Sequence, residues 1–179
     1  SQVNCDMNAE DKTTGRRNFL DGEGVVNLRF LIEFMKRTGH TTETLSNAMG
    51  YKSRQAVYHW LKNDDVKIGN VITLFNNLGY EIKFSLVPRD GKIEGPAEVI
   101  MVTEEVQQEG NFDSRLAFLY NAFMRSPKTY DTLAKEMGFK SRITVYHWLK
   151  EADNCKLSQV YKCAEALEQK LKIEIEPKK

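Results

Sequence analysis

A fourteen-residue stretch that occurs twice decides the fold of this chain: residues 49–62 read MGYKSRQAVYHWLK, and residues 137–150 read MGFKSRITVYHWLK. Eleven of the fourteen positions are identical. Tyr51 and Phe139, which differ, are both aromatic. A match of this quality indicates an internal repeat, which organises every later assignment.

The similarity extends outward from this stretch. Residues 34–36 match residues 123–125 upstream, and residues 81–86 match residues 170–175 downstream after a one-residue shift. Each copy therefore covers roughly 60 residues. We divide the chain into four parts: a flexible N-terminal arm at 1–23, a first repeat at 24–87, an acidic linker at 88–113 and a second repeat at 114–179.

Four helices and a strand are predicted in the first repeat. Apolar residues recur every three to four positions through four segments and then alternate with polar residues. Thr41 and Ser53 are the predicted N-caps of the second and third helices, and Gly39 and Gly50 end the first and second. The helices are expected at residues 25–37, 42–49, 53–62 and 67–78, and the strand at residues 82–86.

The second repeat shows the same order, with a first helix at 114–125 that ends before Pro127 and a strand at 172–176. A β-branched run at 98–103 predicts a further strand in the linker. Because an isolated strand is unstable, we expect the three strands to share a small sheet between or beside the repeats. The fold class is therefore mainly α: two repeated four-helix units, each ending in a β-strand.

Apolar spacing also predicts the core. Val57, Trp60 and Leu61 form an i, i+3, i+4 stripe on the third helix, and Trp148 is equivalent to Trp60. Four methionines at helical spacing are predicted core residues as well: Met35, Met49, Met124 and Met137. The three cysteines have no spacing typical of a disulfide framework or a zinc site, so we expect buried or inert thiols at Cys5, Cys155 and Cys163.

Composition excludes several classes of protein. With 41% apolar and 28% charged residues, the chain has enough apolar material for a core. It contains no apolar run of about 18 residues, so we expect no membrane span. The polar first 27 residues lack the apolar segment of a secretory signal. We therefore expect a cytoplasmic protein that does not contact a membrane.

The net charge of +1 hides an uneven distribution. Residues 24–92 carry ten basic and six acidic side chains, and residues 115–179 carry thirteen and eight, so these blocks have net charges of +4 and +5. Residues 93–114 carry six acidic side chains and no basic one. A mildly basic block fits either a nucleic-acid partner or an ordinary solvated surface.

The second and third predicted helices of each repeat, joined by a short turn that glycine opens, form a helix-turn-helix motif. The core stripe leaves the opposite side of the third helix, near its N-terminus, free to enter a DNA major groove about 12 Å wide. The candidate DNA-binding residues on this side are Lys52, Ser53, Arg54, Gln55, Tyr58, His59 and Lys62 in the first repeat, and Lys140, Ser141, Arg142, Ile143, Tyr146, His147 and Lys150 in the second.

On these residues, each repeat resembles the lambda repressor-like helix-turn-helix domains of phage and bacterial regulators (the Cro type). The matching core positions are Leu45, Ala48, Gly50, Val57 and Trp60, and Leu133, Met137, Gly138, Val145 and Trp148. The resemblance implies a transcriptional regulator that binds double-stranded DNA and reads bases with the start of its third helix. The chain departs from the family in two respects. A strand replaces the fifth helix, and two modules share a chain where family members usually carry one and dimerise.

The candidate residues differ in what they can read. Arg54 and Arg142 fit bidentate bonds to guanine, and Gln55 fits adenine. Ile143 permits only apolar contact, for example with a thymine methyl group, so the two repeats are expected to prefer different sequences. The lysines and serines at the helix starts suit phosphate groups, which orient the protein without specifying sequence.

Two other classes of function stay open. A helix-turn-helix fold kept only for protein contacts would explain the modest charge, although the matched Lys-Ser-Arg turns argue against it. The pairs Arg54/His59 and Arg142/His147 match the Arg-x4-6-His spacing of a family of helical ribonucleases, in which His transfers a proton. No paired carboxylates or glycine-rich phosphate loop accompany this spacing. We therefore expect no enzyme, cofactor, metal or small-molecule ligand, and we leave homodimerisation open.

Overall fold

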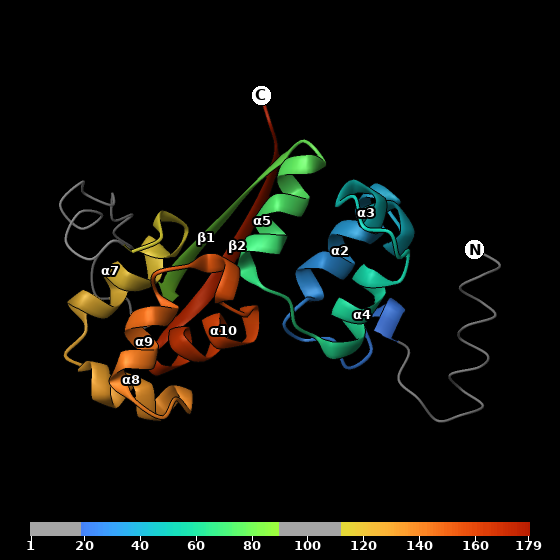
Figure 1. Ribbon diagram of the computed structural model, residues 1–179. Helices are drawn as coiled ribbons and strands as arrows, with labels where there is room; N and C mark the ends of the chain where they lie inside the picture. The colour runs from blue at the N-terminus through green and yellow to red at the C-terminus, as the bar shows by residue number, and fades with distance from the viewer. Residues whose placement is uncertain (1–18, 90–111) are drawn as a thin grey trace. The chain divides into compact units, whose positions relative to one another are not determined.

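The computed structural model describes residues 19–89 and 112–179 (Figure 1). This part of the chain is mainly helical, with eight α-helices and a two-stranded antiparallel sheet. It contains two helical halves that each end in a strand, which confirms the mainly α class and the predicted strand at the end of each half. The expected strand at 98–103 and Cys5 lie outside the described residues.

Both halves have the same order of elements. The first half contains the 3-10 helix η1 (Phe19–Asp21), α2 (Arg29–Thr38), α3 (Thr42–Ala48), α4 (Ala56–Asn63), α5 (Ile68–Asn77) and β1 (Tyr80–Pro88). The second half contains η2 (Ser114–Leu116), α7 (Ala117–Arg125), α8 (Tyr130–Met137), α9 (Arg142–Trp148), η3 (Ala152–Asn154), α10 (Leu157–Ala166) and β2 (Gln169–Pro177).

The chain folds as two compact units, residues 1–65 and residues 66–179. The first unit holds α2, α3 and α4. The second unit holds the whole second repeat together with α5 and β1 of the first. The boundary between the units therefore does not coincide with the end of the first sequence repeat at residue 87, because β1 forms its sheet with β2.

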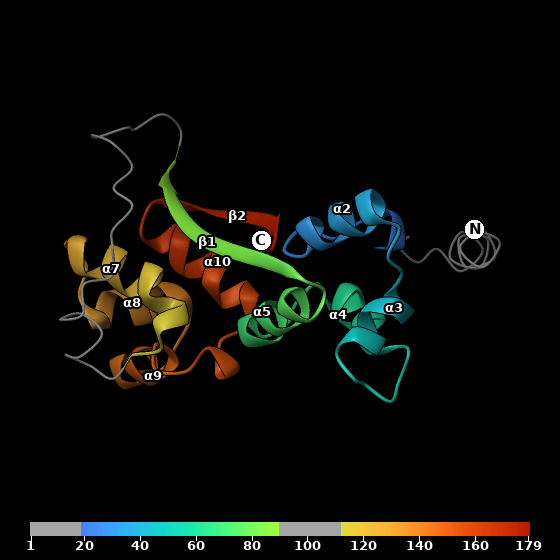
Figure 2. The same ribbon diagram turned by 90° about the horizontal axis from the view of Figure 1, so that it is seen from above.

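The sheet joins equivalent residues of the two repeats. β1 and β2 lie side by side in Figures 1 and 2, and Phe84 is paired with Ile173. In the alignment of the repeats, residues 81–86 correspond to residues 170–175, so Phe84 and Ile173 are the same position. A strand that pairs antiparallel with its own equivalent is related to it by a local two-fold axis, which passes through this pair.

A second pairing obeys the same symmetry. Lys67 and Lys156 form an isolated antiparallel bridge. One backbone hydrogen bond of 2.8 Å flanks it on each side, from the Ile68 amide to the Cys155 carbonyl and from the Leu157 amide to the Val66 carbonyl. The two lysines are again equivalent, because each directly precedes the fourth helix of its repeat. The bridge joins the starts of α5 and α10, and the sheet joins the strands that follow them. The last helix and strand of each repeat thus share one pseudo-symmetric core.

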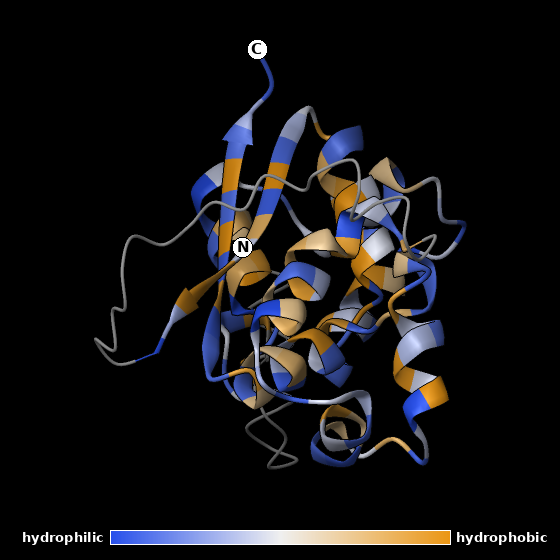
Figure 3. Ribbon diagram, turned by 90° about the vertical axis from the view of Figure 1, so that its left-hand side faces the viewer, coloured by the Kyte–Doolittle hydropathy of each residue, from blue (hydrophilic) through white to orange (hydrophobic). Residues whose placement is uncertain are grey.

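Apolar side chains from both repeats fill this core. Phe75 of α5 and Cys163 of α10 are buried, and Phe84 stacks on Phe118 of α7 with ring centroids 5.9 Å apart. Hydrophobic and hydrophilic positions alternate along both strands (Figure 3), as expected for a sheet with one covered face. Burial raises the pKa of the Cys163 thiol to about 12, so this cysteine is protonated and unreactive at neutral pH.

The first helix begins later than predicted. It starts at Arg29 and not at Val25, because Asp64 holds the preceding turn. The Asp64 carboxylate accepts hydrogen bonds of 3.0–3.1 Å from the backbone amides of residues 26–28. A carboxylate from the end of α4 thus holds the turn that leads into α2 and satisfies the backbone amides of that turn.

Some core and boundary predictions are also corrected. Trp60 is half-buried and packs edge-on against Tyr51, whereas Trp148 is buried as predicted. Met124 is 48% exposed and is not a core residue, while Met137 is buried. Residues 19–23, which we assigned to a flexible arm, contain η1 and a turn.

Removal of the Phe84 ring should destabilise the second unit by about 2 kcal/mol, because the ring contacts both its cross-strand partner and Phe118. Urea denaturation of Phe84→Ala, followed by circular dichroism, measures this loss. The matched control is Lys83→Ala, on the exposed side of the same strand, for which we expect a change within about 0.5 kcal/mol. Equal losses in the two variants would contradict the sidedness of the sheet.

Candidate nucleic-acid interface

The helix-turn-helix of the first unit consists of α3 and α4. Thr41 caps α3 as predicted: its hydroxyl accepts the Thr44 amide at 3.2 Å, and the Thr44 hydroxyl accepts the Thr41 amide in return. Gly50 follows the helix end with φ 73°, a left-handed conformation that glycine adopts without a Cβ clash. The predicted bounds of this helix are therefore nearly correct.

The third helix of the first repeat starts later than we predicted. α4 begins at Ala56, and Ser53 is not its N-cap. The Ser53 hydroxyl instead accepts the amide of Gln55 at 3.1 Å within the turn. Arg54 and Gln55 therefore lie in the turn just before the helix. In the second repeat, by contrast, Ser141 occupies the N-cap position and Arg142 is the first helical residue.

A buried serine that the sequence analysis did not identify fixes this turn. Ser46 of α3 has no exposed surface. Its hydroxyl accepts the amide of Val57 at 3.2 Å and donates to the carbonyl of Arg54 at 3.3 Å. It thus fastens the start of α4 to α3. The only hint in the sequence is a small residue beside Leu45, and the second repeat has Ala134 at the same position.

The seven candidate residues of the first repeat are all at least partly accessible to solvent. All are exposed except Tyr58, which is half-buried and meets the His59 ring edge-on. Arg54 is 74% exposed and forms a 3.6 Å ion pair with Glu43 of α3. Exposed pairs of this kind contribute roughly 0–1 kcal/mol, so the Arg54 guanidinium can exchange Glu43 for another anion at little cost.

A hollow of about 870 Å³ adjoins three of these residues. Arg54, Gln55 and Tyr58 line one side of it, and α2 together with the start of α3 lines the other. Two of its lining residues, Lys36 and Arg54, are cationic and two, Asp21 and Glu43, are acidic. The hollow therefore carries no excess of either charge.

The helix-turn-helix of the second unit consists of α8 and α9. Thr129 caps α8, accepting the Thr132 amide at 3.1 Å, and Gly138 ends the helix with φ 78°. The candidate residues of this repeat are exposed, except for the half-buried Lys150. Ile143 is 60% exposed and Tyr146 is 36% exposed.

Aromatic rings back the exposed face of α9. Tyr146 lies edge-on to Phe112 at 5.4 Å and to Tyr130 at 6.5 Å, and Lys150 places its ammonium 4.3 Å from the centre of the Tyr146 ring. Burial, together with the neighbouring tyrosines, raises the pKa of Tyr130. The first repeat has the smaller Thr42 at the position of Tyr130. The second face is therefore the more apolar of the two.

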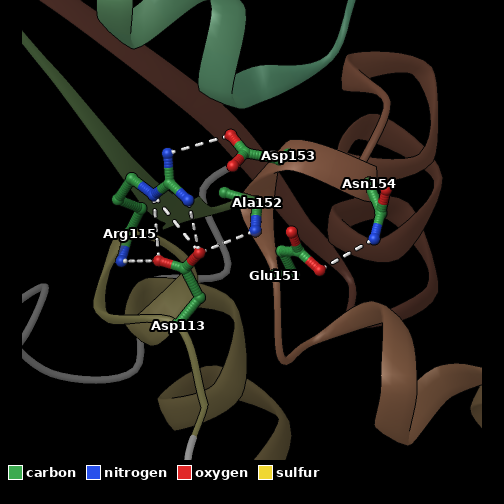
Figure 4. Close-up of polar contacts among 6 residues, drawn as sticks. All are labelled: Asp113, Arg115, Glu151, Ala152, Asp153 and Asn154. Atoms are coloured by element: carbon green, nitrogen blue, oxygen red, sulfur yellow. Dashed lines mark hydrogen bonds and ion pairs between the residues drawn. The ribbon is translucent and has the colours of Figure 1, made fainter.

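A charged cluster joins the segment before α7 to the turn after α9 (Figure 4). Asp113 accepts the amide of Ala152 at 2.7 Å and the guanidinium of Arg115 at 2.7 Å, and Arg115 also reaches Asp153 at 3.3 Å. Burial would raise the pKa of Asp113, but the hydrogen bonds from Arg115 and Ala152 outweigh it and lower the pKa below its usual value. The cluster thereby fixes the end of α9 against the start of the first helix of its repeat.

Two further kinds of feature, metal-binding clusters and membrane-spanning helices, are absent from the described residues. In residues 19–89 and 112–179 no cluster of histidine, cysteine and acidic side chains could hold a metal ion. Within the same ranges, no helix has the length and apolar character needed to cross a lipid bilayer.

Comparison with known proteins finds no matching family model, no matching curated protein and no matching solved structure.

Loss of the Ser46 hydroxyl should leave the Val57 amide buried without its acceptor. We expect Ser46→Ala to destabilise the first unit by about 1–3 kcal/mol and to increase hydrogen exchange at the start of α4. Urea denaturation and hydrogen-exchange mass spectrometry over residues 54–58 measure both effects. Ser53→Ala, which removes an exposed turn contact, is the control and should lose about 0.5 kcal/mol. If the two variants lose the same stability, Ser46 does not hold the turn.

The lowered pKa of Asp113 predicts a loss of stability in acid. An ionised carboxylate with a depressed folded-state pKa stabilises the protein above its unfolded pKa of about 3.9, and the contribution disappears as pH falls through the folded pKa. Asp113→Asn should therefore lose about 2 kcal/mol at pH 7 and converge with the parent protein in strong acid. Urea midpoints from pH 7 to pH 2 provide the measurement, with Glu165→Gln on the exposed side of α10 as the control. Parallel curves for Asp113→Asn and the parent would refute the assignment.

Proposed function

We propose that this chain binds double-stranded DNA in a sequence-specific manner, as a transcriptional regulator of the lambda repressor-like type. The residues at the starts of α4 and α9 enter major grooves and read bases. Lys52 and Lys140 contact phosphate groups, which position the protein without selecting a sequence.

One observation carries this proposal: the same basic turn is exposed at the start of the third helix in both repeats. Lys-Ser-Arg at 52–54 and at 140–142 is exposed, while Val57 and Val145 on the opposite side of the two helices are fully buried. Packing therefore does not require these basic side chains. A cationic, hydrogen-bonding helix start on a rigid helix-turn-helix is the arrangement with which such motifs contact DNA.

The pseudo-symmetric core favours a chain with two DNA-binding modules. Regulators of this type use two-fold symmetry to place two recognition helices on half-sites about 34 Å apart. Here the local two-fold axis through Phe84 and Ile173 relates the last helix and strand of the two repeats. Within the second unit, these paired elements thus carry an internal symmetry of the kind that a dimer obtains from two subunits.

A second candidate is a protein-interaction module. The exposed apolar side chains Met124, Ile143 and Tyr146 of the second repeat favour it, because exposed apolar groups also occur at protein interfaces. Selection of binding sites from a random pool of DNA duplexes at two salt concentrations separates the candidates. An enriched site with two halves supports DNA recognition. Weak binding without enrichment, lost at moderate salt, supports the interaction module.

Replacement of either arginine should weaken specific binding. Arg54→Ala and Arg142→Ala are each expected to cost about 1–3 kcal/mol on the selected duplex and to relax the preference at one base pair. Fluorescence anisotropy with the selected and a scrambled duplex measures both effects. Lys172→Ala on the exposed side of β2 is the control and should leave binding unchanged. Retained affinity and preference in the Arg54→Ala/Arg142→Ala double variant would exclude base reading by these residues.

A further inference from the structure

The two candidate reading faces differ in chemistry at one equivalent position. Gln55 and Ile143 occupy it, and both side chains are exposed. The neighbouring positions Arg54 and Arg142, by contrast, carry the same residue. Among the candidate DNA-binding residues, this is the position at which the two repeats differ.

Ile143 is exposed although burial is the usual place for an isoleucine. It is the second residue of α9, and 60% of its surface is accessible. The inward side of this helix is formed by Val145 and Trp148, which are buried, so Ile143 takes no part in the core stripe. Exposure of an apolar side chain at the start of this helix gives the second repeat a contact group without hydrogen-bonding capacity.

The surroundings of Ile143 extend this apolar character. Tyr146 lies one turn further along the same side of α9, where Phe112 and Tyr130 hold its ring. Arg142 directly precedes Ile143 and supplies the hydrogen-bond donors at this end of the helix. The second face thus places an apolar side chain directly after Arg142, whereas the first places an amide directly after Arg54.

We propose that the second repeat recognises a thymine through van der Waals contact of Ile143 with the C5-methyl group, while the first repeat recognises an adenine through Gln55. This inference rests on the proposed function and specifies its site. In the major groove the thymine methyl is the apolar feature that distinguishes T·A from the other base pairs, and adenine presents the N6/N7 pair that an amide side chain can bind. The DNA site therefore has two unlike halves.

Deoxyuridine isolates this contact. It keeps every hydrogen-bonding group of thymidine and lacks only the methyl group. In the duplex selected by the full chain, thymidines are replaced by deoxyuridine one at a time, and dissociation constants are measured by fluorescence anisotropy. One replacement in the second half-site is expected to weaken binding about fourfold, the effect of one buried methyl group.

A reciprocal exchange of the two residues provides matched variants. Ile143→Gln should lose the sensitivity to deoxyuridine and select adenine at the same position. Gln55→Ile should gain a thymine preference and deoxyuridine sensitivity in the first half-site. Both positions are exposed, so circular dichroism of the variants is expected to match that of the parent.

The outcomes separate this inference from the function on which it rests. If the chain selects a duplex but every deoxyuridine replacement leaves the affinity unchanged, the thymine contact is refuted and DNA recognition stands. Two identical half-sites would also refute it. If no duplex is selected, both proposals fail. A fourfold loss that disappears in Ile143→Gln supports the contact.

Discussion

The antiparallel pairing of β1 with β2 is the constraint on which the rest of the second unit depends. Neither strand can form a sheet within its own repeat, because each repeat supplies one strand and a lone strand leaves its backbone groups unpaired. Pairing across the repeats satisfies these groups and brings α5 and α10 together over the sheet. The bridge between Lys67 and Lys156 pairs the backbones of the two repeats again, at the starts of α5 and α10. As a result, Phe84 and Ile173, which are equivalent in sequence, are also partners in space.

Each repeat uses a carboxylate to hold its third helix, but the two carboxylates have different positions in the sequence. Asp64 follows α4 and accepts the amides that precede α2. Asp113 precedes α7 and accepts the amide of Ala152, which follows α9. In both cases an anion joins the start of the first helix to the end of the third. Because buried backbone amides require acceptors, the two repeats make the same connection with carboxylates that do not align.

The two candidate DNA-binding faces share a common frame and differ in their exposed side chains. The shared turn places an arginine at each third-helix start, and the buried valines Val57 and Val145 hold both helices in the same way. Exposed positions such as Gln55 and Ile143 are free to differ between the repeats, because packing does not restrict them. The larger Tyr130, in place of Thr42, adds an aromatic backing to the second face only.

The repeat, the order of four helices and a strand, the cap at Thr41 and the exposed face of each third helix follow from the amino-acid sequence, because local periodicity and capping encode these features. These local signals do not determine the start of α4 or the half-exposure of Trp60. Both depend on tertiary contacts, since the Ser46 hydroxyl on α3 accepts the Val57 amide in the first turn of α4 and the packing of neighbouring helices sets burial. Strand pairing likewise depends on contacts between residues about ninety positions apart, and no local pattern specifies such partners.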